Sequence, residues 1–303
     1  MDSGTIHVQT NPKVEVGVQV AVSVVIPAKN EAVRVGAVVS QVRALHPEFE
    51  ILVIDDGSVD ETATAARAAG ATVISHPYSK GNGAAIKTGA RRARGDVLVF
   101  MDADGQHDPR EIDALLQKLT VGYDMIVGAR EASGQANNAR HLANTVFNRL
   151  ASWMVGHQIE DLTSGFRAAY RDKFSEFLYL LPNGFSYPTT STMAFFRSGY
   201  SVSYVPIHVA PRLGQSHIFA LRDGVKFLLI IFRIGTLYSP LRIFFPTSFL
   251  LAILGLGYYV YTFIEQARFT NMSALLLTGA LVTFLFGLLS EQITSLIYKR
   301  DRP

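Results

Sequence analysis

Two long uncharged stretches near the C-terminal end constrain the fold of this chain more than any other feature. Ile243–Ile264 and Phe269–Ser290 each contain 22 residues without Asp, Glu, Lys or Arg. A helix of that length rises roughly 33 Å, which is enough to cross a hydrocarbon core of about 30 Å. The alternative is a pair of buried helices in a soluble protein, although such helices usually carry charges on one face. The pattern therefore predicts two membrane spans.

The charges around these stretches predict how the spans are oriented. Only Glu265–Arg268 separates them, whereas Arg233 and Arg242 precede the first span and Lys299 and Arg300 follow the second. Basic residues collect on the cytoplasmic side of membrane helices. We therefore expect a hairpin that enters and leaves the membrane on the cytoplasmic side, with the preceding domain and both termini in the cytoplasm.

The rest of the chain predicts a domain that precedes the membrane anchor. Residues 1–20 lack the continuous apolar core of a signal peptide and form an N-terminal extension, and residues 21–217 form an α/β domain. Residues 218–240 mix the apolar run FLLIIF with basic residues, which is typical of an amphipathic helix in the membrane interface. A core helix of the domain is the alternative for this segment. The hairpin and its short tail then occupy residues 241–303.

Composition limits the partners and the chemistry. The chain has 28 Lys and Arg against 25 Asp and Glu, and this net charge of +3 is too small to hold a nucleic-acid backbone. It contains no cysteine, which excludes a disulfide scaffold, a thiolate metal site and a cysteine nucleophile. We therefore expect the lipid bilayer as a partner and no nucleic acid.

Strand-like and helix-like segments alternate along residues 21–128. Continuous Val and Ile runs suit strands that are buried on both faces, and the segments between them have the length of crossover helices. This rhythm predicts a mostly parallel, Rossmann-like sheet. The predicted strands are AVSVVIP, EILVIDD, ATVIS, DVLVFMD and DMIVG, and the predicted helices cover residues 31–45, 60–69, 83–94 and 109–119.

Acidic residues stand at the ends of these predicted strands, where open parallel sheets bind their ligands. Asp55 ends one strand, and Asp102 and Asp104 follow another with one residue between them, so that both point to the same side of an extended chain. Carboxylates and the amide of Gln106 are hard oxygen ligands that suit Mg²⁺ or Mn²⁺. The alternative for an isolated D-x-D pattern is a solvated turn. Its position after a buried strand favours a metal and diphosphate site.

The glycine-rich stretch Lys80–Ala85 opens a predicted helix. It is not a dinucleotide-binding fingerprint, because the third glycine of G-x-G-x-x-G would fall at Ile86. The loop still offers backbone N–H groups and the side chain of Lys80 near a helix start, and this combination suits an anion.

Six motifs in order carry a family resemblance. VVIPAKNEA, ILVIDDGSVDET, KGNGAAIKTGA, MDADGQHDP, VGAR and DLTSGFRAAYR resemble the successive motifs of family 2 glycosyltransferases with the GT-A fold. The chain is most similar to the group of dolichol-phosphate mannose synthases and polyprenyl-phosphate glycosyltransferases. The resemblance covers about Val22 to Ser216, and the two-span tail resembles bacterial members as well.

The resemblance implies roles for residues at matching positions. The implied nucleotide-sugar site comprises Pro27, Lys29, Glu31, Val53, Asp55, Lys80, Asp102, Ala103 and Arg130. The implied site for the acceptor and the diphosphate comprises Arg140, Arg212, Ser216 and His217, with His217 standing where a lysine is common. The implied metal ligands are Asp102, Asp104 and Gln106, and the implied catalytic residues are Asp104, Asp161 and Arg140.

The implied reaction moves a monosaccharide from a nucleotide sugar, of the GDP-mannose or UDP-hexose type, to a polyprenyl or dolichyl phosphate with inversion. A lipid phosphate is already an anion near neutral pH, so it needs no strong general base. Asp161 is then expected to orient the acceptor or the sugar, and a cap for the turn before a buried strand is the alternative. Arginine suits phosphate because its planar fork binds two oxygens.

Two other functions are compatible with parts of the sequence. A processive polysaccharide synthase is disfavoured, because the Q-x-x-R-W motif is absent around the only tryptophan, Trp153. A catalytically inactive membrane scaffold is disfavoured by the intact carboxylates. Self-association is also possible, because Gly255 and Gly257 would let helices approach closely, although they could equally pack against the second span.

Overall fold

The structure, a computed structural model, describes residues 20–130, 138–184, 186–209 and 240–300 together with positions 229, 232, 235 and 236. It divides into two compact units. The first comprises Met1–Asn148 and Ile159–Ala220, and the second comprises Arg149–Gln158 and Leu221–Pro303. The predicted N-terminal extension and interfacial helix lie almost entirely outside the described residues.

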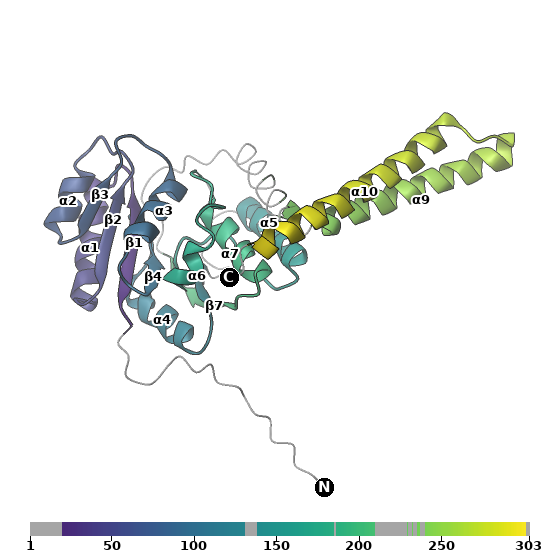
Figure 1. Ribbon diagram of the computed structural model, residues 1–303. Coiled ribbons are helices and arrows are strands. Elements are labelled where there is room, and N and C mark those ends of the chain that lie inside the picture. The colour runs from purple at the N-terminus through teal and green to yellow at the C-terminus, as the bar shows by residue number, and fades with distance from the viewer. Residues whose placement is uncertain are drawn as a thin grey trace, which may run out of the picture. The chain divides into compact units, whose positions relative to one another are not determined.

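The first unit is built on a seven-stranded sheet with the order β3-β2-β1-β4-β6-β5-β7 (Figure 1). Strand β6 is antiparallel to both of its neighbours, and the other strand pairs are parallel. The start of β6 therefore lies at the sheet edge where the parallel strands end. The strands are β1 (Val22–Ala28), β2 (Glu50–Asp55), β3 (Thr72–Ser75), β4 (Val97–Phe100), β5 (Met125–Arg130), β6 (Arg167–Tyr170) and β7 (Val202–Ile207).

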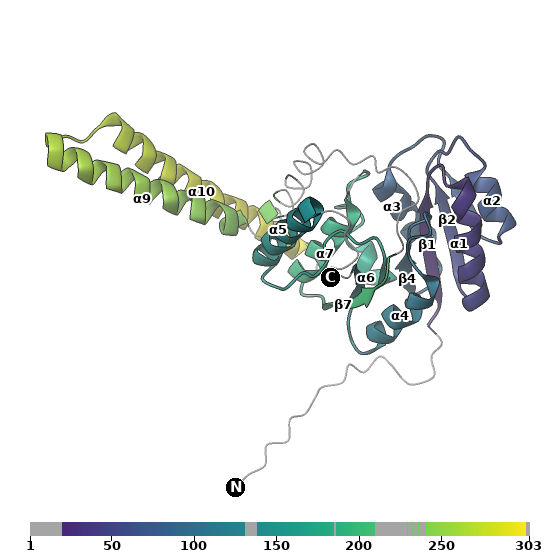
Figure 2. The ribbon, with the colours of Figure 1, turned by 180° about the vertical axis from the view of Figure 1, so that it is seen from behind.

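Helices cover both faces of this sheet, with α1 and α2 on the side opposite α3 (Figures 1 and 2). Successive strand residues alternate between the two faces. On β1, Val24 and Ile26 join the core under α1, while Val25 contacts Gly89 of α3. The helices of this unit are α1 (Ala32–Leu45), α2 (Thr62–Ala68), α3 (Asn82–Arg92), the 3-10 turn η1 (Pro109–Glu111), α4 (Ile112–Thr120), α6 (Arg171–Ser175) and α7 (Tyr187–Arg197).

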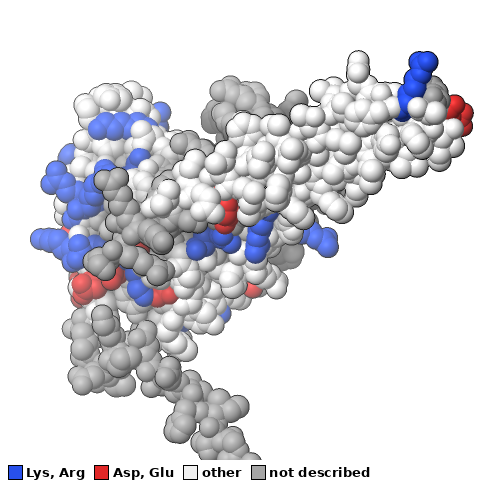
Figure 3. Space-filling view, turned by 45° about the vertical axis from the view of Figure 1, so that its right-hand side comes forward, with Lys and Arg blue, Asp and Glu red and all other residues white. Residues whose placement is uncertain are grey.

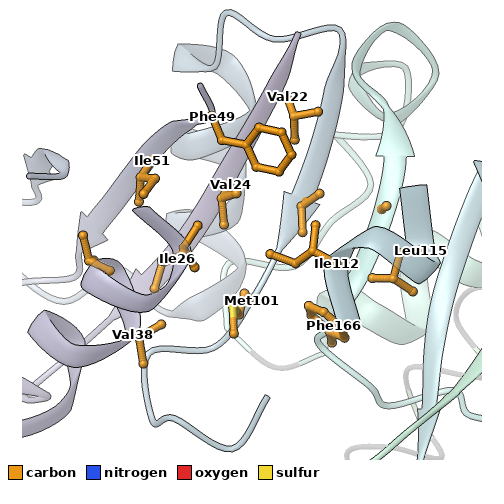
Figure 4. Close-up of a cluster of buried hydrophobic side chains, with 14 of the residues drawn as sticks. Val22, Val24, Ile26, Val38, Phe49, Ile51, Met101, Ile112, Leu115 and Phe166 are labelled. Atoms are coloured by element: carbon orange, nitrogen blue, oxygen red, sulfur yellow. The ribbon is translucent and has the colours of Figure 1, made fainter. Parts of the chain in front are cut away.

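The main hydrophobic core lies between the sheet and helices α1 and α4. Val24 and Ile26 of β1 belong to one buried cluster with Ile112 and Leu115 of α4 and with Phe166, which precedes β6 (Figure 4). Each of these five side chains is fully buried. At about 25 cal/mol per Å² of apolar surface, such burial supplies the main free energy of folding. The continuous Val and Ile runs are therefore explained by strands that are covered on both faces.

All five strands predicted from the hydrophobic runs are present, and so are the four predicted helices. The parallel sheet is confirmed as the dominant feature. Strands β6 and β7 and helices α5 (Asn138–Val155) and α6 were not predicted as elements. The RAAY strand β6 has four residues, which is too short to show a periodic pattern.

The second unit contains an antiparallel pair of helices, α9 (Pro240–Gln266) and α10 (Asn271–Arg300), which include both predicted spans. Pro240–Glu265 and Asn271–Thr294 are long and apolar enough to cross a membrane. Figure 3 shows their surface as nearly free of charge between the ends of the hairpin.

Helix α5 (Asn138–Val155) connects β5 to the segment before β6.

Contacts between small residues hold the hairpin together. The Ser248 hydroxyl donates a hydrogen bond to the Ala280 carbonyl across the pair, at 2.7 Å. Gly255 lies so close to Leu276 and Leu277 that an added Cβ would come within 3.0 to 3.1 Å of them. Gly255 therefore packs against the hairpin's own second helix, whereas a Cβ added to Gly257 would meet no described atom of another element within 4 Å. Self-association stays a prediction.

Candidate active site

A cavity of about 530 Å³ opens at the carboxyl edge of the sheet. Its wall is formed by the loops after β1, β2, β3 and β4, by the segment before β6 and by the start of α7. Ligands of open α/β sheets bind at this edge. The lining residues with polar side chains are Lys29, Glu31, Asp56, Ser79, Asn82, Asp102, Asp104, Gln106, Thr163, Ser186 and Tyr187.

The predicted metal-binding segment lines this cavity. Asp102, Ala103, Asp104 and Gln106 all contribute to its wall. Gly105 has a φ of 73°, a left-handed conformation that favours glycine and turns the loop back. The turn is fixed by the Gln106 backbone N–H, which donates to Asp104 Oδ1 at 3.1 Å.

A second glycine makes room beside Asp102. A Cβ placed on Gly165 would lie 2.9 Å from Asp102 Oδ2, so the backbone of Gly165 lies directly against the carboxylate. Any larger residue there would displace Asp102.

The donor atoms present suit a hard divalent cation. Asp102 and Asp104 supply carboxylate oxygens and Gln106 an amide oxygen, as Mg²⁺ and Mn²⁺ prefer. Within the described ranges, no group of three or more His, Cys, Asp or Glu side chains is arranged to hold a metal. A protein that offers two carboxylates needs a ligand such as a diphosphate, and water, to complete six-coordination.

Asp56 is the structural centre of the opposite wall. Its carboxylate accepts four hydrogen bonds, from His76 Nδ1 at 2.7 Å and from Ser79 Oγ, Lys80 N and Gly81 N at 2.8 Å each. Burial alone raises the pKa of Asp56, but these hydrogen bonds outweigh it and lower the pKa to about 2. Asp56 therefore ties the loop after β3 to the end of β2.

The other predicted nucleoside-binding residues divide into two groups. Pro27, Lys29 and Glu31 line the cavity, and Lys29 Nζ donates to Ser79 Oγ at 3.0 Å. Asp55 is buried and is not among the lining residues; its Oδ1 accepts from Ser58 N at 3.0 Å. Asp56, which was not selected from the sequence, lines the cavity in its place.

Val53 lies away from the cavity. Its side chain is fully buried in the hydrophobic core, in the interior of β2. The Val53 side chain is therefore not part of the cavity wall, and a role of Val53 in nucleotide binding stays a prediction.

Most backbone N–H groups of the glycine-rich loop donate to acceptors within the protein. Lys80 and Gly81 donate their N–H groups to Asp56, and Gly83 and Ala84 donate theirs to the carbonyls of Gly184 and Asn183. These four N–H groups are therefore already used within the protein, and an anion site at this loop stays a prediction.

The glycines of this loop serve close packing. A Cβ on Gly83 would lie 1.9 Å from the Pro182 carbonyl oxygen, and Gly81 has a φ of 103°. The Lys80 side chain is exposed and lies over the Tyr78 ring, 5.7 Å from its centre.

Arg130 and Asp161 form a two-point ion pair at the end of β5. Arg130 Nε and Nη2 donate to Asp161 Oδ2 and Oδ1 at 2.8 and 3.0 Å. Asp161 Oδ1 also accepts from the backbone N–H groups of Thr163 and Ser164. Burial raises the pKa of Asp161, but the hydrogen bonds and the charge of Arg130 and the backbone donors lower it by more. The pKa of Asp161 therefore lies below its usual range. Asp161 shapes the loop that leads to Thr163.

Comparison with protein families agrees with the α/β fold and with a ligand site at the carboxyl edge of the sheet. The model for glycosyl transferase family 2 matches residues 23–178, and the model for the GtrB C-terminal hairpin matches residues 239–296. This chain belongs to glycosyl transferase family 2. The second match covers α9 and most of α10.

Relatives of this family 2 glycosyltransferase extend over most of its length. Glycosyltransferase AglJ of Haloferax volcanii is 29% identical, covering 91% of this chain and 94% of its own. Polyprenol monophosphomannose synthase of Mycolicibacterium smegmatis is 34% identical, covering 64% of this chain and 79% of its own.

The fold of the glycosyltransferase is also found among solved structures. Glucosyl-3-phosphoglycerate synthase of Mycobacterium tuberculosis, crystallised with Mn²⁺, UDP-glucose and phosphoglyceric acid, matches with a TM-score of 0.60 at 21% identity. The match covers 72% of this chain and 80% of that enzyme. This similarity supports the GT-A fold.

Four residues predicted for the acceptor side of the glycosyltransferase cannot be placed in the site. Arg212, Ser216 and His217 lie outside the described residues, and Arg140 belongs to α5 but its side chain is not described. Their roles stay predictions.

Several wall residues were missed by sequence reasoning. Ser186 was not considered, Tyr187 was weighed between an acceptor-side segment and the core, and Thr163 and Gly165 stood in a motif without roles of their own. The DLTSGF motif was the one available signal, since it must stand near the site in this family.

Proposed function

We propose that this glycosyltransferase transfers a monosaccharide from a nucleotide sugar to a polyprenyl phosphate, with inversion at the anomeric carbon. The observation that carries the proposal is the cavity that Asp102, Asp104 and Gln106 share with Lys29 and Asp56 at the carboxyl edge of the sheet. A UDP- or GDP-sugar is a donor of suitable size and charge for it. The acceptor class is supported by the polyprenol monophosphomannose synthase relative and by the apolar hairpin.

A divalent cation is part of the proposal. Asp102, Asp104 and Gln106 would hold Mg²⁺ or Mn²⁺ together with the donor diphosphate. When bound, the ion supplies a Lewis acid that neutralises the charge of the leaving nucleoside diphosphate. The chain's own residues hold the donor: Lys29 faces it from the wall after β1.

The reaction proposed needs no general base. The nucleophile is an oxygen of the lipid phosphate, which is an anion near neutral pH, and it attacks the anomeric carbon as the bond to the diphosphate breaks. Asp161 is consistent with this mechanism, because its oxygens accept hydrogen bonds from Arg130, Thr163 and Ser164. We assign Asp161 to positioning Arg130 and the loop to Thr163.

The hairpin explains how a soluble donor and a lipid acceptor meet. A polyprenyl tail stays in the bilayer, so its phosphate must be reached at the membrane surface. We propose that α9 and α10 anchor the enzyme there, with the catalytic domain and both termini in the cytoplasm, where nucleotide sugars are made available.

The proposed orientation predicts the sides on which two reporters lie. A reporter inserted near Asn271, where α10 begins after the loop, should lie outside the cytoplasm, and a reporter at the C-terminus should lie inside. Protease protection or a compartment-sensitive fluorescent reporter checks both positions. Two reporters on the same side would contradict the hairpin orientation.

The experiment that tests the function is nucleoside diphosphate release by the full-length protein in detergent. It is run with Mn²⁺ or Mg²⁺ and a panel of UDP- and GDP-sugars, with and without a short polyprenyl phosphate. Release that depends on the lipid and is lost in Asp104→Ala supports the proposal. Asp113→Ala is the matched control, because that carboxylate is 76% exposed on α4. Release that Asp104→Ala leaves unchanged, or that ignores the lipid, would refute it.

A further inference from the structure

A buried arginine and a buried tyrosine lie behind the Asp102 side of the cavity. Arg167, the first residue of β6, and Tyr187, the first residue of α7, are 0% and 1% exposed. The guanidinium lies over the Tyr187 ring, 5.6 Å from its centre. The other neighbour of the ring is Phe100 at the end of β4, with 6.0 Å between the ring centres.

Both side chains hold the same short piece of backbone. The Tyr187 hydroxyl donates to the Gly165 carbonyl at 2.9 Å, and Arg167 Nη2 donates to the Ser164 carbonyl. Two successive carbonyls of the segment before β6 are thus fixed by side chains from β6 and α7. Gly165 is the residue whose backbone lies against Asp102 Oδ2.

The remaining donors of Arg167 fasten this segment to the start of α7. Arg167 Nη1 donates to the Pro188 carbonyl at 3.1 Å, to Ser191 Oγ at 2.8 Å and to Thr192 Oγ1 at 3.1 Å. Tyr187 and Pro188 themselves line the cavity. The arginine therefore joins two parts of the wall that are more than 20 residues apart in sequence.

The burial of the Arg167 guanidinium costs free energy of folding, which a residue with only a structural role would not need. In the described part of the chain Arg167 forms no ion pair, and its Nε lacks a hydrogen-bond partner. Burial accordingly lowers the pKa of Arg167. A buried cation without a carboxylate partner is destabilising, and an apolar side chain of similar volume would often be more stable. The segment that it holds lies beside the metal-binding carboxylate.

We propose that Tyr187 and Arg167 are positioning residues for Asp102, which they hold in its ligand geometry through the backbone of Ser164 and Gly165. The inference rests on the proposed function, because it takes Asp102 as a ligand of the divalent cation. The affinity for the cation is then set by the hydrogen bond that the Tyr187 hydroxyl donates to the Gly165 carbonyl. Loosening that bond lets Gly165 move and releases the carboxylate from its position.

Tyr187→Phe is the sharpest test, because it removes one hydroxyl and keeps the ring against Phe100 and Arg167. Tyr200→Phe is the matched control. It also removes a tyrosine hydroxyl that donates a hydrogen bond, to Glu176 Oε1 at 2.7 Å, but Tyr200 is not among the residues lining the cavity. One lost hydrogen bond is worth about 1 kcal/mol, so both variants should fold.

The measurement is equilibrium dialysis of radioactive Mn²⁺ against the full-length protein in nanodiscs, with UDP or GDP at equal concentration in both chambers. We expect Tyr187→Phe to weaken Mn²⁺ binding about tenfold and Tyr200→Phe to leave it unchanged. In the transfer assay, excess Mn²⁺ should restore the turnover of Tyr187→Phe. A general folding defect would lower turnover at every Mn²⁺ concentration.

Equal Mn²⁺ affinity in wild type and Tyr187→Phe would overturn this inference and leave the proposed function intact. The same holds if turnover falls but excess Mn²⁺ fails to restore it. Absence of Mn²⁺ binding by the wild type with either nucleotide would overturn both the inference and the proposed metal site.

Discussion

Two acidic strand ends in the same sheet have different surroundings. Asp56, after β2, receives four hydrogen bonds from its own protein and joins two loops. Asp102 and Asp104, after β4, line the cavity from a turn that a left-handed Gly105 creates, and one of them lies against a glycine that leaves space. Both ends read as short runs of aspartate in the sequence. The four donors to Asp56 all come from the segment that follows β3.

The contrast separates carboxylates that build the wall from carboxylates that face the ligand. Asp161 belongs with Asp56, because Arg130 and two backbone N–H groups occupy its oxygens. A carboxylate saturated by protein donors has a lowered pKa and gains little from a metal ion. Changes at the two kinds of position should therefore affect different measured quantities.

The largest effect is expected at Asp102. Asp102→Asn should reduce kcat/KM for transfer by about 10³-fold, as removal of a group that stabilises the departing diphosphate does, and should change Tm little. Steady-state kinetics and thermal unfolding in the same detergent measure both. A large fall in Tm would place Asp102 with the wall-building carboxylates.

The next effect is expected at Asp161. Asp161→Asn breaks the pair with Arg130 and should destabilise the fold by about 2 kcal/mol, with roughly tenfold lower turnover. Chemical denaturation of the detergent-solubilised protein gives the first quantity. If turnover instead falls as far as in Asp102→Asn while stability is unchanged, Asp161 acts at the reacting centre and not through Arg130.

Asp56 should be visible in the acid dependence of stability. Its pKa is lowered from 3.8 to about 2, so the ionised carboxylate stabilises the fold above its ordinary pKa, and that contribution disappears as the pH falls through about 2. The lost contribution is roughly 2 kcal/mol. Asp56→Asn should be less stable near neutral pH and should lose less stability between about pH 4 and pH 2. If the free energy of unfolding of wild type and of Asp56→Asn changes equally between about pH 4 and pH 2, the four hydrogen bonds do not stabilise the ionised Asp56 carboxylate.

The smallest effect is expected at Lys29, whose exposed side chain reaches Ser79 across the cavity wall. Lys29→Ala should raise the KM of the donor a few-fold without changing kcat, because one exposed contact is lost. Arg92→Ala, at the exposed end of α3, is the control, because Arg92 is not among the residues lining the cavity. An unchanged KM would remove Lys29 from the nucleotide site.

Much of the fold could be predicted because its strands are buried on both faces and are read directly as apolar runs. The two spans were equally plain, since 22 uncharged residues have few other uses. The four-residue strand β6 could not be predicted, because its pairing with β4 and β5 is set by residues distant in sequence.

The site was predictable where a motif carries its chemistry and not where packing decides. Asp102, Asp104, Gln106 and Lys29 line the cavity as expected. Asp55 and Asp56 are adjacent and identical in type, so only the loop after β3 reveals which of them faces the cavity. The glycines of the KGNG loop suggested an anion site, whereas they allow the chain near Pro182 to approach closely.

The most direct test of this account is to locate Mn²⁺ in a crystal of the protein with a nucleoside diphosphate, from the anomalous scattering of manganese. The account predicts one strong peak between Asp102 and Asp104, next to the diphosphate, and none at Asp56 or Asp161. A peak at Asp56, or a bound nucleotide without manganese near Asp102 and Asp104, would contradict it.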